Sequence, residues 1–124
     1  MQYFMGIDNG GSICKSVIFD GAGNEIASSS ARLELLTPHA GFTERDMDDL
    51  WRVNCQVIRE TIRQSGIDVS EIIGAACTGH GKGLYLWGKD EKPSYTGIVS
   101  TDSRAWRYPE KWSADGTADR VGRI

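Results

Sequence analysis

The sequence predicts an α/β fold in which three antiparallel strands precede the first helix. Residues 2–8 and 12–20 are typical of a hairpin, because an apolar run ends at a glycine pair and an alternating run follows. Turn residues 21–24 lead to a third predicted strand over residues 25–33. A helical pattern begins only after residue 45. This order argues against a doubly wound nucleotide-binding fold, which places a helix directly after its first strand.

Composition excludes several broad classes of function. The chain has 124 residues, of which 40% are hydrophobic and 25% charged, which suits one globular domain or part of a larger one. A net charge of −3 gives no reason to expect a nucleic acid or an anionic membrane as partner. No apolar run approaches a membrane span, and no signal peptide is visible. Three widely spaced cysteines indicate reduced thiols in a cytoplasmic protein, and with two histidines they form no metal-ligand cluster.

The first glycine pair is the first candidate site. Asp8 closes the opening strand beside Gly10 and Gly11, and Ser12 adds a hydroxyl. Glycines let backbone N–H groups approach phosphate oxygens closely, and a carboxylate can hold a bridging divalent cation. The alternative is an ordinary hairpin turn, since Asn and Gly are common turn residues. Neither Lys15 nor Lys82 lies in a P-loop pattern.

The middle of the chain predicts a loop over residues 34–45 and a helix from Asp46 to Gln64, ended by Gly66. Thr43 with Asp46 forms a near capping box. The apolar positions form one predicted stripe: Met47, Leu50, Trp51, Cys55, Ile58 and Ile62. Because Trp51 lies on this stripe, we expect it to pack in the core.

The pattern of the second half predicts three more strands around two polar segments. A strand is entered over residues 69–74, and its small apolar run to Cys77 suits a strand buried on both faces. The run ends at the glycine-rich segment 78–83, and strand patterns resume over 84–87 and 97–101.

The last predicted element is a helix over residues 103–116, with Asp115 and Gly116 as its stop. Pro109 predicts a kink or break at Tyr108. Trp106 and Trp112 are expected in the core or at an interface.

The first motif resembles a known family. Gly6-Ile7-Asp8-x-Gly10-x-Ser12-x-x-Lys15, with Asp20 closing the second strand, is similar to the first phosphate motif of sugar kinases with an actin-like ATPase fold, and within these of the FGGY carbohydrate kinases. The predicted order β-β-β-α-β-β-α is likewise the opening of the ribonuclease-H-like half of that superfamily. Many members have Thr where this chain has Gly11.

Two later segments extend the resemblance. Residues 78–83 resemble the xylulokinase segment Ser/Thr-Gly-Gln-Met-His-Gly, with His80, Gly81 and Lys82 in place of Gln, Met and His. The Gly-Lys-Gly form resembles the L-xylulose kinase branch. Asp102 and Arg104 match the family's Trp-x-Asp-x-Arg, with Ser100 at the Trp position, and Gly41-Phe42-x-Glu44 resembles the segment before the family's first long helix.

The resemblance implies an ATP- and Mg²⁺-dependent kinase that phosphorylates a small sugar, most like a pentulose such as L-xylulose or D-xylulose. Asp8 would be the magnesium-linked carboxylate, and the phosphates would lie at Gly10, Gly11, Ser12 and Lys15. The sugar would be bound by His80, Gly81, Lys82, Asp102 and Arg104. Alternatives drawn from the residues themselves are a solvated loop lysine for Lys82 and a helix N-cap for Asp102.

Family members are much longer than this chain, and their general base and adenosine site lie in parts that it does not contain. We therefore expect residues 1–124 to be the first part of the N-terminal, sugar-binding domain, with no catalytic base, without the C-terminal domain, and inactive in isolation. Open sheet edges predict self-association or a homodimer. The alternative is a non-catalytic sugar-binding or interaction module with the actin-like ATPase fold.

Overall fold

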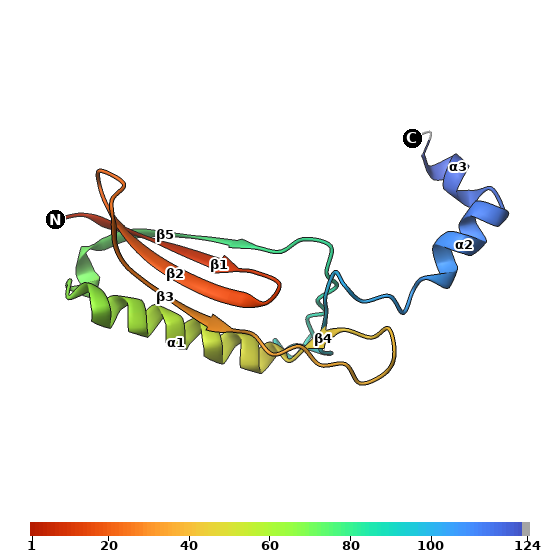
Figure 1. The fold of residues 1–124 in the computed structure, drawn as a ribbon, viewed down its shortest axis with the longest axis horizontal. Helices are drawn as coiled ribbons and strands as arrows, with labels where there is room; N and C mark the ends of the chain where they lie inside the picture. Colours follow the sequence, from red (N-terminus) through yellow and green to blue (C-terminus); the bar gives the residue numbers. More distant parts are fainter. Residues whose placement is uncertain (123–124) are drawn as a thin grey trace.

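The computed structural model describes residues 1–122 and is built on a four-stranded mixed sheet (Figure 1). The strands lie in the order β3-β2-β1-β5. β1 (Tyr3–Asn9), β2 (Ile13–Asp20) and β3 (Glu25–Arg32) are antiparallel neighbours, and β5 (Ile72–Gly79) runs parallel to β1. The three leading strands that the sequence predicts are thus confirmed.

A single long helix, α1 (Met47–Ser65), covers one face of the sheet and lies over β2 and β3 (Figure 1). Its N-cap is Asp46, whose side chain accepts from the backbone N–H of Asp49 at 2.9 Å, so the capping role suggested for Thr43 is wrong. Gly66 ends the helix in the left-handed region at φ 66°, as predicted.

The buried side of α1 differs from the predicted apolar stripe. The core joins Cys14 of β2 to Val53 and Val57 of the helix, and Trp51 is 72% exposed. The residues that α1 buries are Val53, Asn54, Val57 and Thr61. Asn54 and Thr61 are polar, so a prediction from hydropathy alone wrongly left them outside the core. Thr61 is accommodated because its hydroxyl donates to the Val57 carbonyl at 2.8 Å.

The small apolar run of β5 is not buried on both faces, as the sequence suggested. β5 lies at the edge of the sheet beyond β1, and Ala75, Ala76 and Cys77 are exposed. The physical reason is that α1 packs over β2 and β3, at the opposite edge of the sheet, and does not cover β5.

A second, two-stranded sheet pairs the end of the predicted loop with part of the strand predicted over 97–101. β4 (Glu44–Arg45) pairs antiparallel with β6 (Gly97–Ile98), which is shorter than the strand predicted over 97–101. The strand predicted over 84–87 is reduced to single bridges, of which one joins Leu84 to Ile98. A short 3₁₀ helix, η1 (Val69–Glu71), precedes β5.

The chain continues through α2 (Arg107–Ala114) and α3 (Thr117–Val121), which project away from the main sheet (Figure 1). The predicted break at Tyr108 does not occur, because Pro109 lies in the first turn of α2, where backbone N–H groups need no helical partner. Gly116 separates the two helices at φ 74°. The second of them, α3, was not predicted.

Two tryptophans of this last segment are not core residues. Trp106 is 58% and Trp112 46% exposed, so the core part of the prediction is wrong and the interface part stays a prediction. None of the helices in residues 1–122 is long and apolar enough to cross a membrane.

Candidate functional site

The first candidate site is the turn between β1 and β2. Gly10 donates its backbone N–H to the Ile13 carbonyl at 3.0 Å, and a Cβ at Gly10 would lie 2.8 Å from that same oxygen. A side chain therefore cannot be added at Gly10 without moving backbone. At Gly11 the opposite holds, since no heavy atom lies within 4 Å of an added Cβ. The turn thus has open space in front of Gly11.

Three polar side chains form a row beside this turn. The strand register places Asp8 opposite Lys15 on β2 and beside Thr78 on β5. Residues directly opposite on neighbouring strands share one face of the sheet, and this is the face away from α1, because Cys14 and Ser16 are the residues buried under the helix. A hollow of about 310 Å³ lies here, lined among others by Asp8, Lys15 and Thr78.

This donor set fits a nucleotide phosphate with a divalent cation. Magnesium in proteins is usually held by one or two carboxylates together with phosphate oxygens and water. Asp8 supplies the carboxylate, Lys15 an ammonium group, and the glycine turn unhindered backbone. Within residues 1–122 no group of three His, Cys, Asp or Glu side chains gathers where it would hold a metal ion without such extra ligands.

The turn is held from the helix side by a buried amide. Asn54 of α1 donates from Nδ2 to Asn9 Oδ1 and to the Leu50 carbonyl, each at 2.8 Å. Cys14 Sγ donates to Asn54 Oδ1 at 3.3 Å, and burial, with a smaller contribution from Asp8, raises the pKa of this thiol. Sequence reasoning missed both asparagines, because Asn9 was read as a turn former and Asn54 lay outside the predicted stripe.

The second glycine-rich segment lies directly beside the first turn. Asn9 is paired with Gly79 in the parallel register of β1 and β5, and the His80 N–H donates to the Asn9 carbonyl at 3.0 Å. The structure thus brings together two segments that are 70 residues apart in the chain. Gly81 and Lys82 are exposed on this loop, and Lys82 has a φ of 64°, which is unusual outside glycine.

Tyr85 anchors His80 on that loop. The Tyr85 hydroxyl and His80 Nε2 are hydrogen-bonded at 2.7 Å. The Tyr85 ring lies between two glycines: a Cβ at Gly83 would approach it to 2.6 Å and a Cβ at Gly97 to 2.7 Å. The His80 ring is therefore held by a neighbour that sequence reasoning did not single out, in a slot that depends on two glycines.

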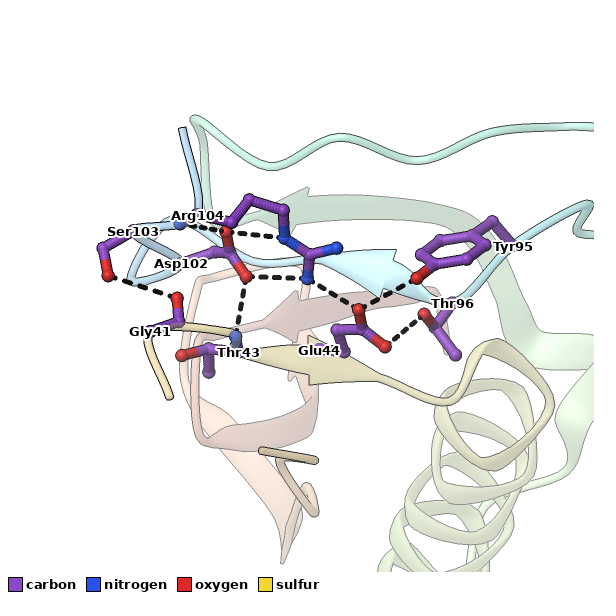
Figure 2. A network of polar contacts seen from close by, with 8 residues as sticks. All are labelled: Gly41, Thr43, Glu44, Tyr95, Thr96, Asp102, Ser103 and Arg104. Atoms are coloured by element: carbon purple, nitrogen blue, oxygen red, sulfur yellow. Dashed lines mark hydrogen bonds and ion pairs between the residues drawn. The ribbon is translucent and has the colours of Figure 1, made fainter. Parts of the chain in front are cut away.

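The third candidate group joins Asp102 to Arg104 (Figure 2). Asp102 Oδ1 accepts from the backbone N–H of Arg104 at 3.0 Å and from Arg104 Nε at 2.9 Å. It is not the helix N-cap that the sequence suggested, because α2 begins at Arg107 and its N-cap is Trp106. Asp102 Oδ2 accepts from Arg104 Nη2 at 2.8 Å and from the Thr43 N–H at 2.7 Å. Hydrogen bonds from Arg104 hold the pKa of Asp102 at about 2, despite its burial.

Glu44 completes this group, although it was not counted among the candidate site residues. It accepts from Arg104 Nη2 at 2.6 Å, from Thr96 Oγ1 at 2.7 Å and from the Tyr95 hydroxyl at 3.2 Å (Figure 2). The hydrogen bond from Thr96 and then that from Arg104 lower the pKa of Glu44, and both carboxylates raise the pKa of Arg104. The Arg104 guanidinium also lies 3.9 Å from the centre of the Phe42 ring.

The short strand β4 links the two halves of the site. Successive residues of a strand point to opposite sides. Glu44 accordingly faces Arg104, whereas Arg45 reaches the glycine turn and donates from Nη2 to the Gly11 carbonyl. β4 therefore connects the Asp102–Arg104–Glu44 group to the glycine turn through two neighbouring residues.

Comparison with known proteins gives an independent view of the chain. A family model described as the FGGY family of carbohydrate kinases, N-terminal domain, matches residues 3–124. The probable L-xylulose kinase of Pasteurella multocida is 35% identical over 121 residues, which are 98% of this chain and 25% of that relative. The L-xylulose/3-keto-L-gulonate kinase of Escherichia coli is 37% identical over 120 residues, 97% of this chain and 24% of that relative.

Solved structures agree on the fold. A gluconate kinase from Lactobacillus acidophilus matches with a TM-score of 0.89 at 23% identity, covering 98% of this chain and 24% of that one. A ligand-bound xylulose kinase from the same organism gives the same TM-score and identity over 99% of this chain and 24% of that one. The predicted actin-like ATPase fold is confirmed. The chain spans about a quarter of the length of the curated relatives it matches.

Proposed function

The chain belongs to the FGGY family of carbohydrate kinases, and we propose that it supplies the phosphate-binding turn and part of the sugar site of an ATP- and magnesium-dependent sugar kinase. We further propose that residues 1–124 are the first part of the sugar-binding domain of that enzyme. The single observation that carries the proposal is the row of Asp8 and Lys15 beside an open glycine turn, with the loop of His80 hydrogen-bonded to that turn.

Bound Mg·ATP would supply the transferable phosphoryl group, and the residues of this chain would position and neutralise it. Asp8 would hold the magnesium ion together with phosphate oxygens. Lys15 would balance phosphate charge, and the N–H groups of Gly11 and Ser12 would donate to phosphate oxygens, since the Gly10 N–H already donates to Ile13. Little covalent chemistry is required of the protein in such a transfer, so precise placement of these groups is the main contribution.

The proposed sugar is a pentulose such as L-xylulose. This rests on two L-xylulose kinase relatives that are 35% and 37% identical to the chain, together with the Gly81-Lys82-Gly83 segment. Lys82 would donate to sugar hydroxyls as a three-proton donor. Arg104 would present a guanidinium whose orientation is fixed by Asp102 and Glu44, as the two ion pairs at 2.8 and 2.6 Å suggest.

The test is ADP release by the protein that carries residues 1–124, with Mg²⁺, ATP and a panel of pentuloses, glycerol and gluconate. We expect turnover to be fastest with a pentulose and to be lost in Asp8→Asn, because the substitution removes the cation-binding charge. Sugar binding without any ADP release would contradict the proposal and favour a non-catalytic sugar-binding module.

The isolated chain provides a second, separate test. We expect no sugar-dependent ADP release from residues 1–124 alone, since no general base for the sugar hydroxyl has been assigned among them. Turnover above that of the Asp8→Asn chain would show that this part is sufficient and would overturn the proposed division of the domain.

A further inference from the structure

Arg45 is an unusual residue beside the glycine turn, because it is charged and almost completely buried. Only 2% of it is exposed. Among residues 1–122, its Nε has no hydrogen-bond partner, and none of the ion pairs found there includes it. A buried charge without a counter-charge is unfavourable in the absence of a compensating group. The burial of the Arg45 charge therefore does not follow from a gain in stability and needs another explanation.

The contacts that Arg45 does make are with the turn. Its Nη2 donates to the Gly11 carbonyl and lies 3.5 Å from the Gly10 carbonyl. Both oxygens thus point inward, to the guanidinium. In a planar trans peptide the C=O and the following N–H point in opposite directions. The N–H groups of Gly11 and Ser12 are therefore directed away from Arg45, to the open side of the turn.

The charge of Arg45 acts in the same direction as this geometry. A positive charge in a low-dielectric interior attracts an anion more strongly than an exposed one does. It also polarises the two peptide groups, so that their N–H ends become better donors. Phosphate oxygens in front of Gly11 would meet outward N–H groups with a buried cation behind them, and they would supply the counter-charge that Arg45 lacks.

We propose that Arg45 is a positioning residue for the phosphate-binding turn: it holds the Gly10 and Gly11 carbonyls inward, presents the Gly11 and Ser12 N–H groups to the nucleotide phosphates, and favours their binding through its buried charge. This rests on the proposed function. It adds to it a residue on a different strand, β4, that neighbours Glu44 of the sugar-side group.

The experiment compares three variants of the protein that carries this chain. Arg45→Gln removes the charge and keeps a donor, Arg45→Lys keeps the charge without the guanidinium fork, and Arg52→Gln is the control on an exposed arginine of α1. The dissociation constants of Mg·ADP and of the sugar are measured by calorimetry, and the exchange rates of the Gly11 and Ser12 amide protons by NMR. Circular dichroism and thermal unfolding report on folding.

We expect Arg45→Gln to weaken Mg·ADP binding about 10-fold or more, as for loss of a charge-assisted interaction, with sugar affinity unchanged within about twofold. Arg45→Lys should restore part of the loss, and Arg52→Gln should have no effect. Amide exchange at Gly11 and Ser12 should be slower in Arg45→Gln, because these N–H groups lose the charge that polarises them. If Arg45→Gln does not fold, the same comparison is made with Arg45→Lys, which should bind Mg·ADP more weakly than the unchanged protein.

Each other outcome is decisive. Variants that unfold at lower temperature but bind Mg·ADP as tightly as the unchanged protein would overturn the proposal and leave Arg45 a purely structural residue. Equal loss of sugar and nucleotide affinity would also overturn it. If the unchanged protein does not bind Mg·ADP at all, the proposed function itself fails, and this result is distinct from the first two.

Discussion

Gly10→Ala is the substitution that most directly tests how the turn is built. The added Cβ would lie 2.8 Å from the Ile13 carbonyl oxygen, closer than real Cβ contacts approach, and the obstacle is backbone rather than a side chain that can rotate. The 3.0 Å hydrogen bond from Gly10 to Ile13 must then lengthen or break. Overpacking of this kind costs about 1–3 kcal/mol. We therefore expect the free energy of unfolding to fall by about that amount.

Gly11→Ala is the matched control, one residue along the same turn. Nothing lies within 4 Å of its added Cβ. Replacing a glycine by alanine where the backbone permits it stabilises a protein by about 0.4–1 kcal/mol, because the unfolded chain loses freedom. Gly11→Ala should thus leave the free energy of unfolding unchanged or slightly raised.

The assay is urea unfolding followed by circular dichroism. The two variants are compared when their m-values, the slopes of the free energy of unfolding against urea concentration, are equal. Equal losses in the free energy of unfolding for the two variants would refute the reasoning about backbone contact at Gly10.

Three further outcomes are expected. Since the Asp102 pKa of about 2 lies below its ordinary 3.8, its stabilising contribution is complete above about pH 4 and is lost as the pH falls toward 2. A carboxyl-carbon NMR titration checks the value, and Asp102→Asn should flatten acid unfolding over that range. Trp51→Ser should change the free energy of unfolding by less than about 0.5 kcal/mol. Val57→Ala, in the core, should lower it by about 1–3 kcal/mol. Urea unfolding measures both values. Gly97→Ala should displace the Tyr85 ring and raise the KM for the sugar without changing the KM for ATP. Equal changes in both KM values would contradict the separation of the sugar-side residues from the phosphate-binding turn.

Much of the main sheet could be predicted from the sequence. The alternation of β2 and the turns that follow it depend on local chemistry, and so do the ends of α1 at Asp46 and Gly66. The side of α1 that faces the sheet could not be predicted, because it depends on which strands the helix covers. The polar side chains of Asn54 and Thr61 are buried there because each has a hydrogen-bond partner. Asn54 donates to the Asn9 side chain of β1, and Thr61 donates to a backbone carbonyl of α1.

The site was predicted only in part, for a related reason. Asp8 and the glycine turn are contiguous in sequence, and the hairpin places Lys15 beside them. Glu44 and Arg104 are 60 residues apart in the chain, and the pairing of β4 with β6 brings their segments together. Each of these strands has two residues, which is too short to produce a periodic pattern in the sequence. The sequence therefore pointed to the motifs but not to the contacts that connect them.

The central claim is that nucleotide phosphates bind at the turn from Gly10 to Ser12. The most direct measurement is the change in backbone amide NMR shifts when Mg·ADP is added to the isotopically labelled protein that carries this chain. The account predicts that, within residues 1–124, the largest shifts are those of the Gly11 and Ser12 amides, and that they disappear in Asp8→Asn. Saturable binding of Mg·ADP that leaves the amides of this turn unshifted would contradict it.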